Sequence, residues 1–142
     1  MSKTSKHLLI FVALLFLPIL ACDDDAGTSA SGNCLDVVGK WDITEEIDAS
    51  ACDIDNSSVS VTATVTQNAC QVSLDVFGVS FAGPMDGDTM RLKGSYEELG
   101  YITKDMTLKV SGSDLSGTAT WTYDAYGLYS CQGTSTFTGS KK

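Results

Sequence analysis

The sequence predicts an all-β protein, an eight-stranded antiparallel up-and-down β-barrel, on the basis of three observations. From Gly39 onward, apolar and polar residues alternate with the period of two that is typical of β-strands. Eight such stretches follow one another with short connections between them, which is the pattern of an antiparallel meander. A meander of this size tends to close on itself, because closure removes exposed strand edges.

The alternation also places each strand. The expected strands cover residues 39–47, 58–67, 70–76, 79–85, 89–96, 104–111, 115–123 and 129–139. No helical pattern competes with them after Gly39, because the nearest stretch, 97–103, is too short and is interrupted by Gly100. Four glycines lie inside the expected strands, where glycine often marks the bends that a barrel needs: Gly83, Gly94, Gly117 and Gly133.

The connections between strands fall into two sets, which a meander places at opposite ends of the barrel. The tight connections lie around residues 68–69, 86–88 and 112–114. The longer connections cover residues 48–57, 97–103 and 124–128. The short connection at 77–78 is the exception, because it lies at the long-loop end. We therefore expect one tightly closed end and one end that carries the loops.

The first 21 residues have the pattern of a signal peptide. A basic start is followed by the apolar run 8–20, which is too short to span a bilayer comfortably. The run ends in Ile19-Leu20-Ala21-Cys22, which resembles the bacterial lipobox. This resemblance implies that Cys22 becomes the lipidated N-terminus of the mature protein and anchors it to a membrane of the bacterial cell envelope, inner or outer. An ordinary signal peptide that ends near a cysteine is the alternative.

The remainder of the chain divides into two parts. Residues 22–33 hold the lipidated cysteine and an acidic, then small and polar stretch with no apolar side chains to bury, so we expect a flexible tether. Residues 34–142 form the barrel domain. Without the signal peptide, 7 basic side chains face 18 acidic ones, a net charge of −11. Such an acidic surface argues against nucleic acid and anionic substrates as partners.

Four widely spaced cysteines lie in the barrel domain, with no Cys-x-x-Cys pair, so we expect two disulfides of an exported protein rather than a zinc site. Cys34 precedes the first strand and Cys70 opens the third, which places both at the tight end. Cys52 lies in the first long connection. Cys131 begins the last strand at that same end, and the last strand pairs with the first in a closed barrel. We therefore predict the disulfides Cys34–Cys70 and Cys52–Cys131.

The composition leaves little room for catalysis. The single histidine, His7, lies in the predicted signal peptide, so the mature chain lacks Ser-His-Asp, Cys-His and imidazole-metal sites. Asp86 and Asp88 flank Gly87 in the manner of turn residues rather than metal ligands. We therefore expect no catalytic residue, no metal and no cofactor.

Gly39-Lys40-Trp41, at the head of the first strand, resembles the first motif of the lipocalins. The likeness covers residues 34–140, although the specific motif is three residues long. It implies a barrel that is plugged at one end by Gly39 and Trp41 and that admits small apolar molecules at the other. Two features depart from the lipocalin pattern: the last strand has no arginine to pack over the tryptophan, and the chain is short. Cys34 followed by Gly39-Lys40-Trp41 is also similar to the opening of avidins, but their pockets are rich in tryptophan and this chain has only Trp41 and Trp121.

Two functional hypotheses follow. The first is a membrane-anchored module that binds a small apolar or amphiphilic ligand, lined by inward residues toward the long-loop end: Val59, Val61, Leu74, Phe81, Leu92, Tyr96, Met106, Trp121 and Tyr123. The second is a structural or protein-interaction lipoprotein with a filled core, which presents apolar loop residues to a partner: Tyr101, Ile102, Tyr126, Leu128 and Tyr129. An internal cavity on the order of a few hundred Å³ favours the first hypothesis, and a solid interior favours the second.

Overall fold

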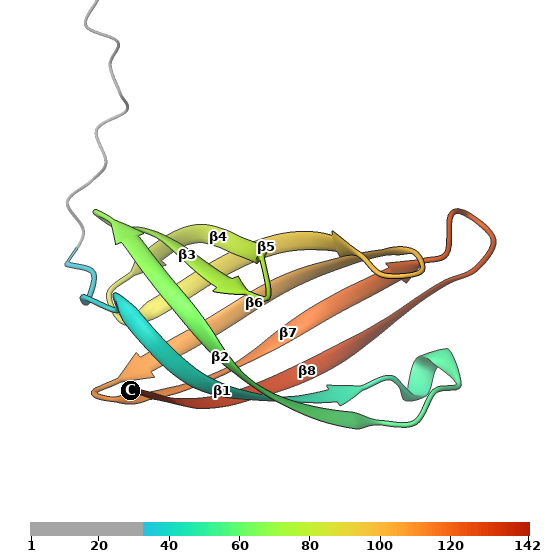
Figure 1. The fold of residues 1–142 in the computed structure, drawn as a ribbon, viewed down its shortest axis with the longest axis horizontal. Coiled ribbons are helices and arrows are strands. Elements are labelled where there is room, and N and C mark those ends of the chain that lie inside the picture. The colour runs from blue at the N-terminus through green and yellow to red at the C-terminus, as the bar shows by residue number, and fades with distance from the viewer. Residues whose placement is uncertain (1–32) are drawn as a thin grey trace, which may run out of the picture.

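The computed structural model describes residues 33–142; the predicted signal peptide and Cys22 lie outside this range. Eight antiparallel strands follow one another in chain order and close into a barrel, so the predicted fold class is confirmed (Figure 1). The elements are β1 (Gly39–Asp48), the short 3-10 helix η1 (Ser50–Cys52), β2 (Ser57–Asn68), β3 (Gln71–Val76), β4 (Val79–Asp86), β5 (Thr89–Glu97), β6 (Tyr101–Ser111), β7 (Asp114–Asp124) and β8 (Ser130–Lys141).

The strand bounds agree with the expected ranges to within two residues, except at the start of β6. The long connection expected at 97–103 is wrong, because Tyr101 pairs with Glu97 and the next two residues continue the ladder. Only residues 98–100 remain as a turn. The β-favouring residues 101–103 therefore extend the strand, and Leu99 and Gly100 make the reversal with positive φ angles. Tyr101 and Ile102 consequently lie on a strand and not in a loop.

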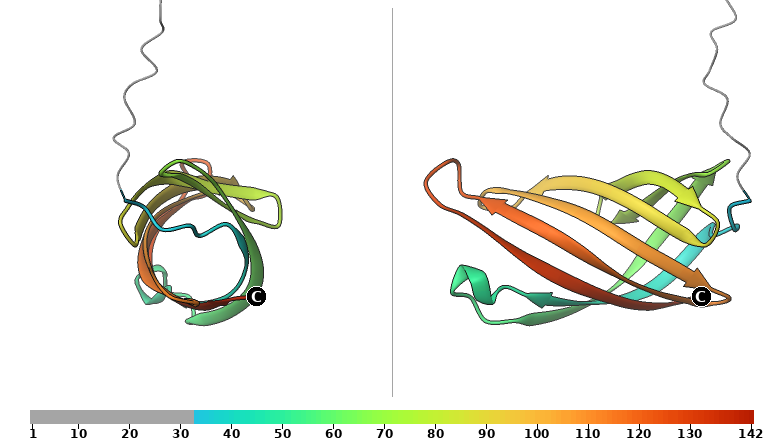
Figure 2. Two further views of the ribbon diagram at one scale, coloured as in Figure 1. Left: turned by 90° about the vertical axis from the view of Figure 1, so that its left-hand side faces the viewer. Right: turned by 180° about the vertical axis from the view of Figure 1, so that it is seen from behind.

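The tight end of the barrel is closed by Trp41 and by the segment that precedes β1. Trp41 is 1% exposed, and its Nε1 donates a hydrogen bond to the carbonyl oxygen of Val37 at 2.9 Å. Val37 is itself fully buried, and its backbone N–H donates to Oε1 of Gln67 at 3.0 Å. Figure 2 (left) shows this blue segment crossing the circle of the barrel. The base of the barrel is thus filled with side chains and spanned by backbone.

A glycine and a lysine hold this base in shape. Gly39 turns the chain into β1 with a φ of +138°, a conformation that residues with a side chain rarely adopt. Nζ of Lys141, near the end of β8, lies 5.9 Å from the centroid of the Trp41 ring, within the range of a cation–π contact. A Cβ atom on Gly39 would approach Cε of Lys141 to 3.1 Å. A lysine therefore covers the tryptophan where the last strand lacks an arginine.

Both predicted disulfides are confirmed. Cys34–Cys70 joins the segment before β1 to the β2–β3 turn, with its Cα atoms 5.7 Å apart. Cys52–Cys131 joins η1 to the start of β8 at the opposite end, with a Cα separation of 5.4 Å. They link residues 36 and 79 positions apart, and each such cross-link stabilises a fold by roughly 2–4 kcal/mol. Each end of the barrel therefore has one covalent brace.

The closed ladder, the core and both disulfides all lie within residues 33–142. The densest part of the core fills the half of the barrel next to Trp41, where several side chains are almost entirely buried: Val65, Val72, Met90, Leu92, Leu108 and Val110. Residues 33–142 therefore contain the closed ladder, the apolar core and the covalent links that a unit folding by itself requires. Within these residues no helix is long and apolar enough to cross a membrane.

Two of the four strand glycines provide room for aromatic rings. A Cβ atom on Gly94 would lie 2.5 Å from a ring carbon of Phe81, and one on Gly133 would lie 2.2 Å from the ring of Trp121. Both distances are too short for real contacts. The glycines are therefore needed where a ring on the neighbouring strand lies flat across the backbone.

We predict that Trp41→Ala lowers the free energy of unfolding by about 3–5 kcal/mol, because it removes a fully buried ring and leaves a void at the base. Lys141→Met, which removes only the charge above that ring, should cost at most about 1 kcal/mol. Urea unfolding of residues 33–142 with intact disulfides, followed by far-UV circular dichroism, measures both. A loss below 1 kcal/mol for Trp41→Ala would contradict the role of Trp41 in closing the base.

Candidate functional site

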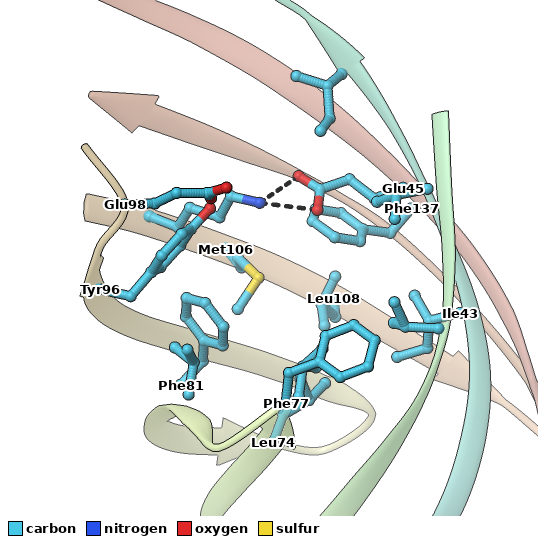
Figure 3. Close-up of a pocket in the computed structure, with 16 residues that line it drawn as sticks. Ile43, Glu45, Leu74, Phe77, Phe81, Tyr96, Glu98, Met106, Leu108 and Phe137 are labelled. Atoms are coloured by element: carbon cyan, nitrogen blue, oxygen red, sulfur yellow. Dashed lines mark hydrogen bonds and ion pairs between the residues drawn. The ribbon is translucent and has the colours of Figure 1, made fainter. Parts of the chain in front are cut away.

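A cavity of about 520 Å³ occupies the half of the barrel opposite Trp41. Its wall is built from β1 to β6 and β8, and most of its side chains are aliphatic or aromatic (Figure 3). The residues that line it are Ile43, Glu45, Ile47, Val59, Val61, Leu74, Val76, Phe77, Val79, Phe81, Tyr96, Glu98, Lys104, Met106, Leu108 and Phe137. The apolar core next to Trp41 forms the floor of the cavity, because Leu74 and Leu108 belong to the core and also line the cavity.

The cavity reaches solvent because two strands of the barrel are short. β3 has 6 residues and β4 has 8, whereas β2 has 12. Figure 1 shows the β3–β4 hairpin ending far short of the β1–β2 and β7–β8 hairpins. β2 pairs with β3 only over Thr64–Asn68, so its first half has β1 as its one strand partner within the described chain. The wall is therefore interrupted between β2 and β5.

The rim of this opening carries exposed side chains that also line the cavity. Phe77, in the β3–β4 turn, is 88% exposed, and Val59 at the free edge of β2 is 41% exposed. Glu98, directly after β5, is also exposed. These residues come from three separate connections or strand ends, and together they define the mouth. The mouth lies toward the long-loop end, as expected for any ligand site in this chain.

Six of the residues expected to line a ligand site do so: Val59, Val61, Leu74, Phe81, Tyr96 and Met106. The other three do not, which corrects the expected lining. Leu92 is fully buried in the core. Trp121 packs on Ala49 and Cys52 beneath η1. Tyr123 packs against the same cluster and donates a hydrogen bond from its hydroxyl to the carbonyl oxygen of Leu99 at 2.8 Å.

Inside the barrel lies an ion pair that is not predicted from the sequence. Nζ of Lys104, on β6, donates hydrogen bonds to both carboxylate oxygens of Glu45, on β1, at 2.6 and 2.8 Å. The two side chains are only 11% and 12% exposed. Figure 3 draws these bonds as dashed lines that end on Glu45. Since β7 and β8 lie between the two strands in the ring, the pair spans the lumen.

The alternation of side chains in the sequence indicates that both members of this pair point into the barrel. Glu45 shares the inward face of β1 with Trp41 and Ile43, and Lys104 shares the inward face of β6 with Met106. A charged residue at an inward position of a predicted barrel requires a partner, because an unpaired buried charge is strongly destabilising. The opposite charges of the two residues make them each other's natural partners.

Tyr96 faces the cavity beside this ion pair. It is half-buried, and its ring meets that of Phe81 edge-on with centroids 6.4 Å apart. Burial, followed by the negative charges of Glu45 and Glu98, raises the pKa of Tyr96 above its ordinary value. Its hydroxyl therefore stays neutral at physiological pH. Neither this hydroxyl nor the Glu98 carboxylate has a hydrogen-bond or ion-pair partner within residues 33–142.

Two further kinds of observation bear on the described part of the chain, metal-ligand clusters and similarity to known proteins. Residues 33–142 contain no group of three or more histidine, cysteine, aspartate or glutamate side chains placed to hold a metal ion. Comparison with protein-family models, curated proteins and solved structures gives no match. The cavity and its lining residues are therefore the features of residues 33–142 that point to a function.

We predict that Lys104→Met lowers the free energy of unfolding by about 3–5 kcal/mol, because it leaves the buried Glu45 carboxylate without a counter-charge. The double variant Glu45→Met/Lys104→Met should return stability to the wild-type value or above it. Urea unfolding at neutral pH measures all three proteins.

Lys93→Met is the matched control for this experiment. Nζ of Lys93 also lies 2.6 Å from a carboxylate oxygen, that of Asp105, but these side chains are 73% and 50% exposed. An exposed pair contributes at most about 1 kcal/mol, so this variant should change stability by no more than that. Equal losses for Lys93→Met and Lys104→Met would show that burial of the Glu45–Lys104 pair has no special cost.

Proposed function

We propose that this protein is a lipocalin-like lipoprotein that binds a small apolar or amphiphilic molecule in its barrel. The observation that carries the proposal is the cavity of about 520 Å³ with a mostly apolar wall. Sites for small ligands generally measure about 300–1,000 Å³ and combine an apolar lining with a few polar groups. An eight-stranded barrel is wide enough for one such ligand when side chains do not fill it. The plug at Trp41 and the open opposite half follow the lipocalin arrangement.

The membrane anchor is part of the same proposal. The lipobox-like Ile19-Leu20-Ala21-Cys22 supports lipidation of Cys22, and the two disulfides fit an exported protein. The segment that follows the predicted tether enters the barrel at the Trp41 end, where Cys34 is fixed to Cys70. The mouth of the cavity lies at the other end. We infer that the protein binds its ligand at the end of the barrel remote from its lipid anchor.

The alternative was a structural or interaction lipoprotein with a filled core, and the cavity argues against a filled core. Apolar side chains are nevertheless exposed at the mouth end: Phe77, Leu99 and Leu128 are 87–91% exposed in three different turns. Phe77 also lines the cavity. We assign this residue to ligand contact, because it joins the exposed rim to the interior.

The backbone at Phe77 supports this assignment. Phe77 and Gly78 connect β3 and β4 with φ angles of 50° and 83°, the signs expected of a type I′ hairpin turn. Asparagine and glycine are favoured there, and a left-handed backbone costs other residues roughly 1–2 kcal/mol. An 88% exposed phenylalanine recovers little of this cost by burial. Stability therefore does not explain Phe77. Leu99 has a similar backbone and exposure, but only Phe77 of the two lines the cavity, and this position supports its contact with a ligand.

We predict that residues 33–142 bind the uncharged fluorophore N-phenyl-1-naphthylamine saturably, with one site per chain. Val61→Phe should raise its Kd by about tenfold or more, because a ring projecting from the lining valine occupies the volume that the ligand needs. Thr66→Phe adds the same ring to the exposed face of the same strand and should leave the Kd unchanged. The absence of a saturable signal, or equal binding by both variants, would reject the proposed function.

We predict opposite effects of Phe77→Asn on stability and on binding. Asparagine suits the left-handed backbone, so the free energy of unfolding should rise by up to about 1 kcal/mol. Loss of the ring at the mouth should weaken fluorophore binding by about threefold to tenfold. Urea unfolding and fluorescence titration measure the two effects. Unchanged binding by a correctly folded Phe77→Asn variant would exclude Phe77 from ligand contact.

A further inference from the structure

The cavity has an excess of negative charge. Three of its lining residues are of a charged type: the carboxylates Glu45 and Glu98 and the amine Lys104. The ammonium group of Lys104 is held by both oxygens of Glu45, so these two charges offset each other inside the barrel. Glu98 remains at the mouth without an ion-pair partner within residues 33–142. A ligand that enters therefore meets one net negative charge.

The connections at this end of the barrel carry further negative charge. The turns and loops of that end carry Asp53 and Asp55 between β1 and β2, and Glu98 between β5 and β6, with Glu97 and Asp124 at the adjoining strand ends. None of the connecting residues 49–56, 77–78, 98–100 and 125–129 is a lysine or an arginine. A concave opening lined by one sign of charge concentrates ligands of the opposite sign. The field at this end therefore favours cations.

An anionic head group has no free partner in the cavity. To reach Lys104 it must displace the Glu45 carboxylate, which would then be left buried without its counter-charge. At the mouth it would lie beside Glu98 and be repelled. A carboxylate or phosphate ligand is therefore disfavoured at both positions, although its apolar tail would fit.

The remaining polar surface suits an ammonium group. Tyr96 lines the cavity together with Glu98, and Figure 3 shows the two side chains on the same side of it. The neutral hydroxyl of Tyr96 can accept a hydrogen bond from an ammonium N–H. The rings of Tyr96, Phe81 and Phe77 present aromatic faces and edges near the mouth, and a cation is attracted to the face of such a ring.

We propose that the ligand of this barrel is a cationic amphiphile, an apolar chain or ring that carries a protonated amine, with the apolar part in the lumen and the ammonium between Glu98 and Tyr96. This inference rests on the proposed function, because it names the ligand class of the same cavity. It assigns Glu98 as the residue that determines specificity. The Glu45–Lys104 pair has a structural role and stays closed when the ligand is bound.

The test compares three ligands with the same ten-carbon chain: decylamine, decan-1-ol and decanoate. Each is titrated against N-phenyl-1-naphthylamine bound to residues 33–142 at pH 7 and low salt. The amine and the carboxylate are kept below their micellar concentrations, and decan-1-ol below its solubility limit. Decylamine, which is protonated at this pH, should bind about fivefold to tenfold more tightly than decan-1-ol, and decanoate more weakly than the alcohol. Added salt should reduce the preference for the amine.

The outcomes separate this inference from the proposed function. If the fluorophore does not bind, or if none of the three ligands displaces it, the proposed function fails. If decan-1-ol binds and decylamine binds no better, or if decanoate binds best, the cavity is a ligand site but the preference for cations is wrong. Decylamine binding that exceeds decan-1-ol binding supports both.

Two variants test whether the carboxylate of Glu98 is the charge that causes the preference for decylamine. Glu98→Gln should lower decylamine affinity to that of decan-1-ol and leave decan-1-ol affinity unchanged. Glu97→Gln removes the same charge from the neighbouring residue, which does not line the cavity, and should keep most of the preference. Gln at position 97 can still accept the hydrogen bond that the Tyr126 hydroxyl donates to Glu97. Retention of the full preference in Glu98→Gln would overturn the assignment of Glu98.

Discussion

The ladder between β1 and β8 is the constraint on which the rest of the structure depends. It runs from the pair Trp41–Lys141 to the pair Asp48–Thr134 and closes the ring. This one register places Lys141 over the ring of Trp41 at the base. The same register sets Glu45 beside Phe137, halfway along the barrel. Because side chains alternate with a period of two, a shift by one residue would turn the plug and the ion pair outward together.

The cavity follows from a mismatch of strand lengths within this closed ring. A barrel with eight strands of equal length would pair every edge, and its wall would be continuous. Here β3 and β4 stop early, and the first half of β2 is left with an edge that no strand within residues 33–142 covers. Ser58, Ser60 and Thr62 on its outer face hydrogen-bond to β1 side chains, which holds the free edge against its one partner. The edge of the barrel wall at the opening is therefore held in place by side-chain hydrogen bonds.

Most of the fold could be predicted from the alternation of side chains and from the turn residues, because the period of two and the connection lengths are local properties of the sequence. They were sufficient for the strand order, closure and both disulfides. These local properties do not predict the position of a residue along the barrel axis. The pattern places Leu92, Trp121 and Tyr123 on the inward face, but it does not say how far along the axis each one lies. The alternation places Glu45 and Lys104 on inward faces and indicates that each needs a partner, but it does not predict the contact between these two side chains. This contact depends on the stagger of strands around the ring, which no single strand encodes.

Stabilising and costly features are distributed unequally along the barrel. The base has Trp41, a dense core and the Cys34–Cys70 bridge, all of which favour folding. The other half holds the unfilled volume, the buried ion pair and Phe77 in a left-handed turn. Selection for stability alone would fill the lumen with aliphatic side chains and put asparagine at that turn. Left-handed non-glycine residues also occur away from the cavity, Ala69 at the base among them, but the unfilled volume and the buried ion pair both belong to the cavity. This is the distribution expected when a cavity is maintained for an occupant and the base supplies the stability that this requires.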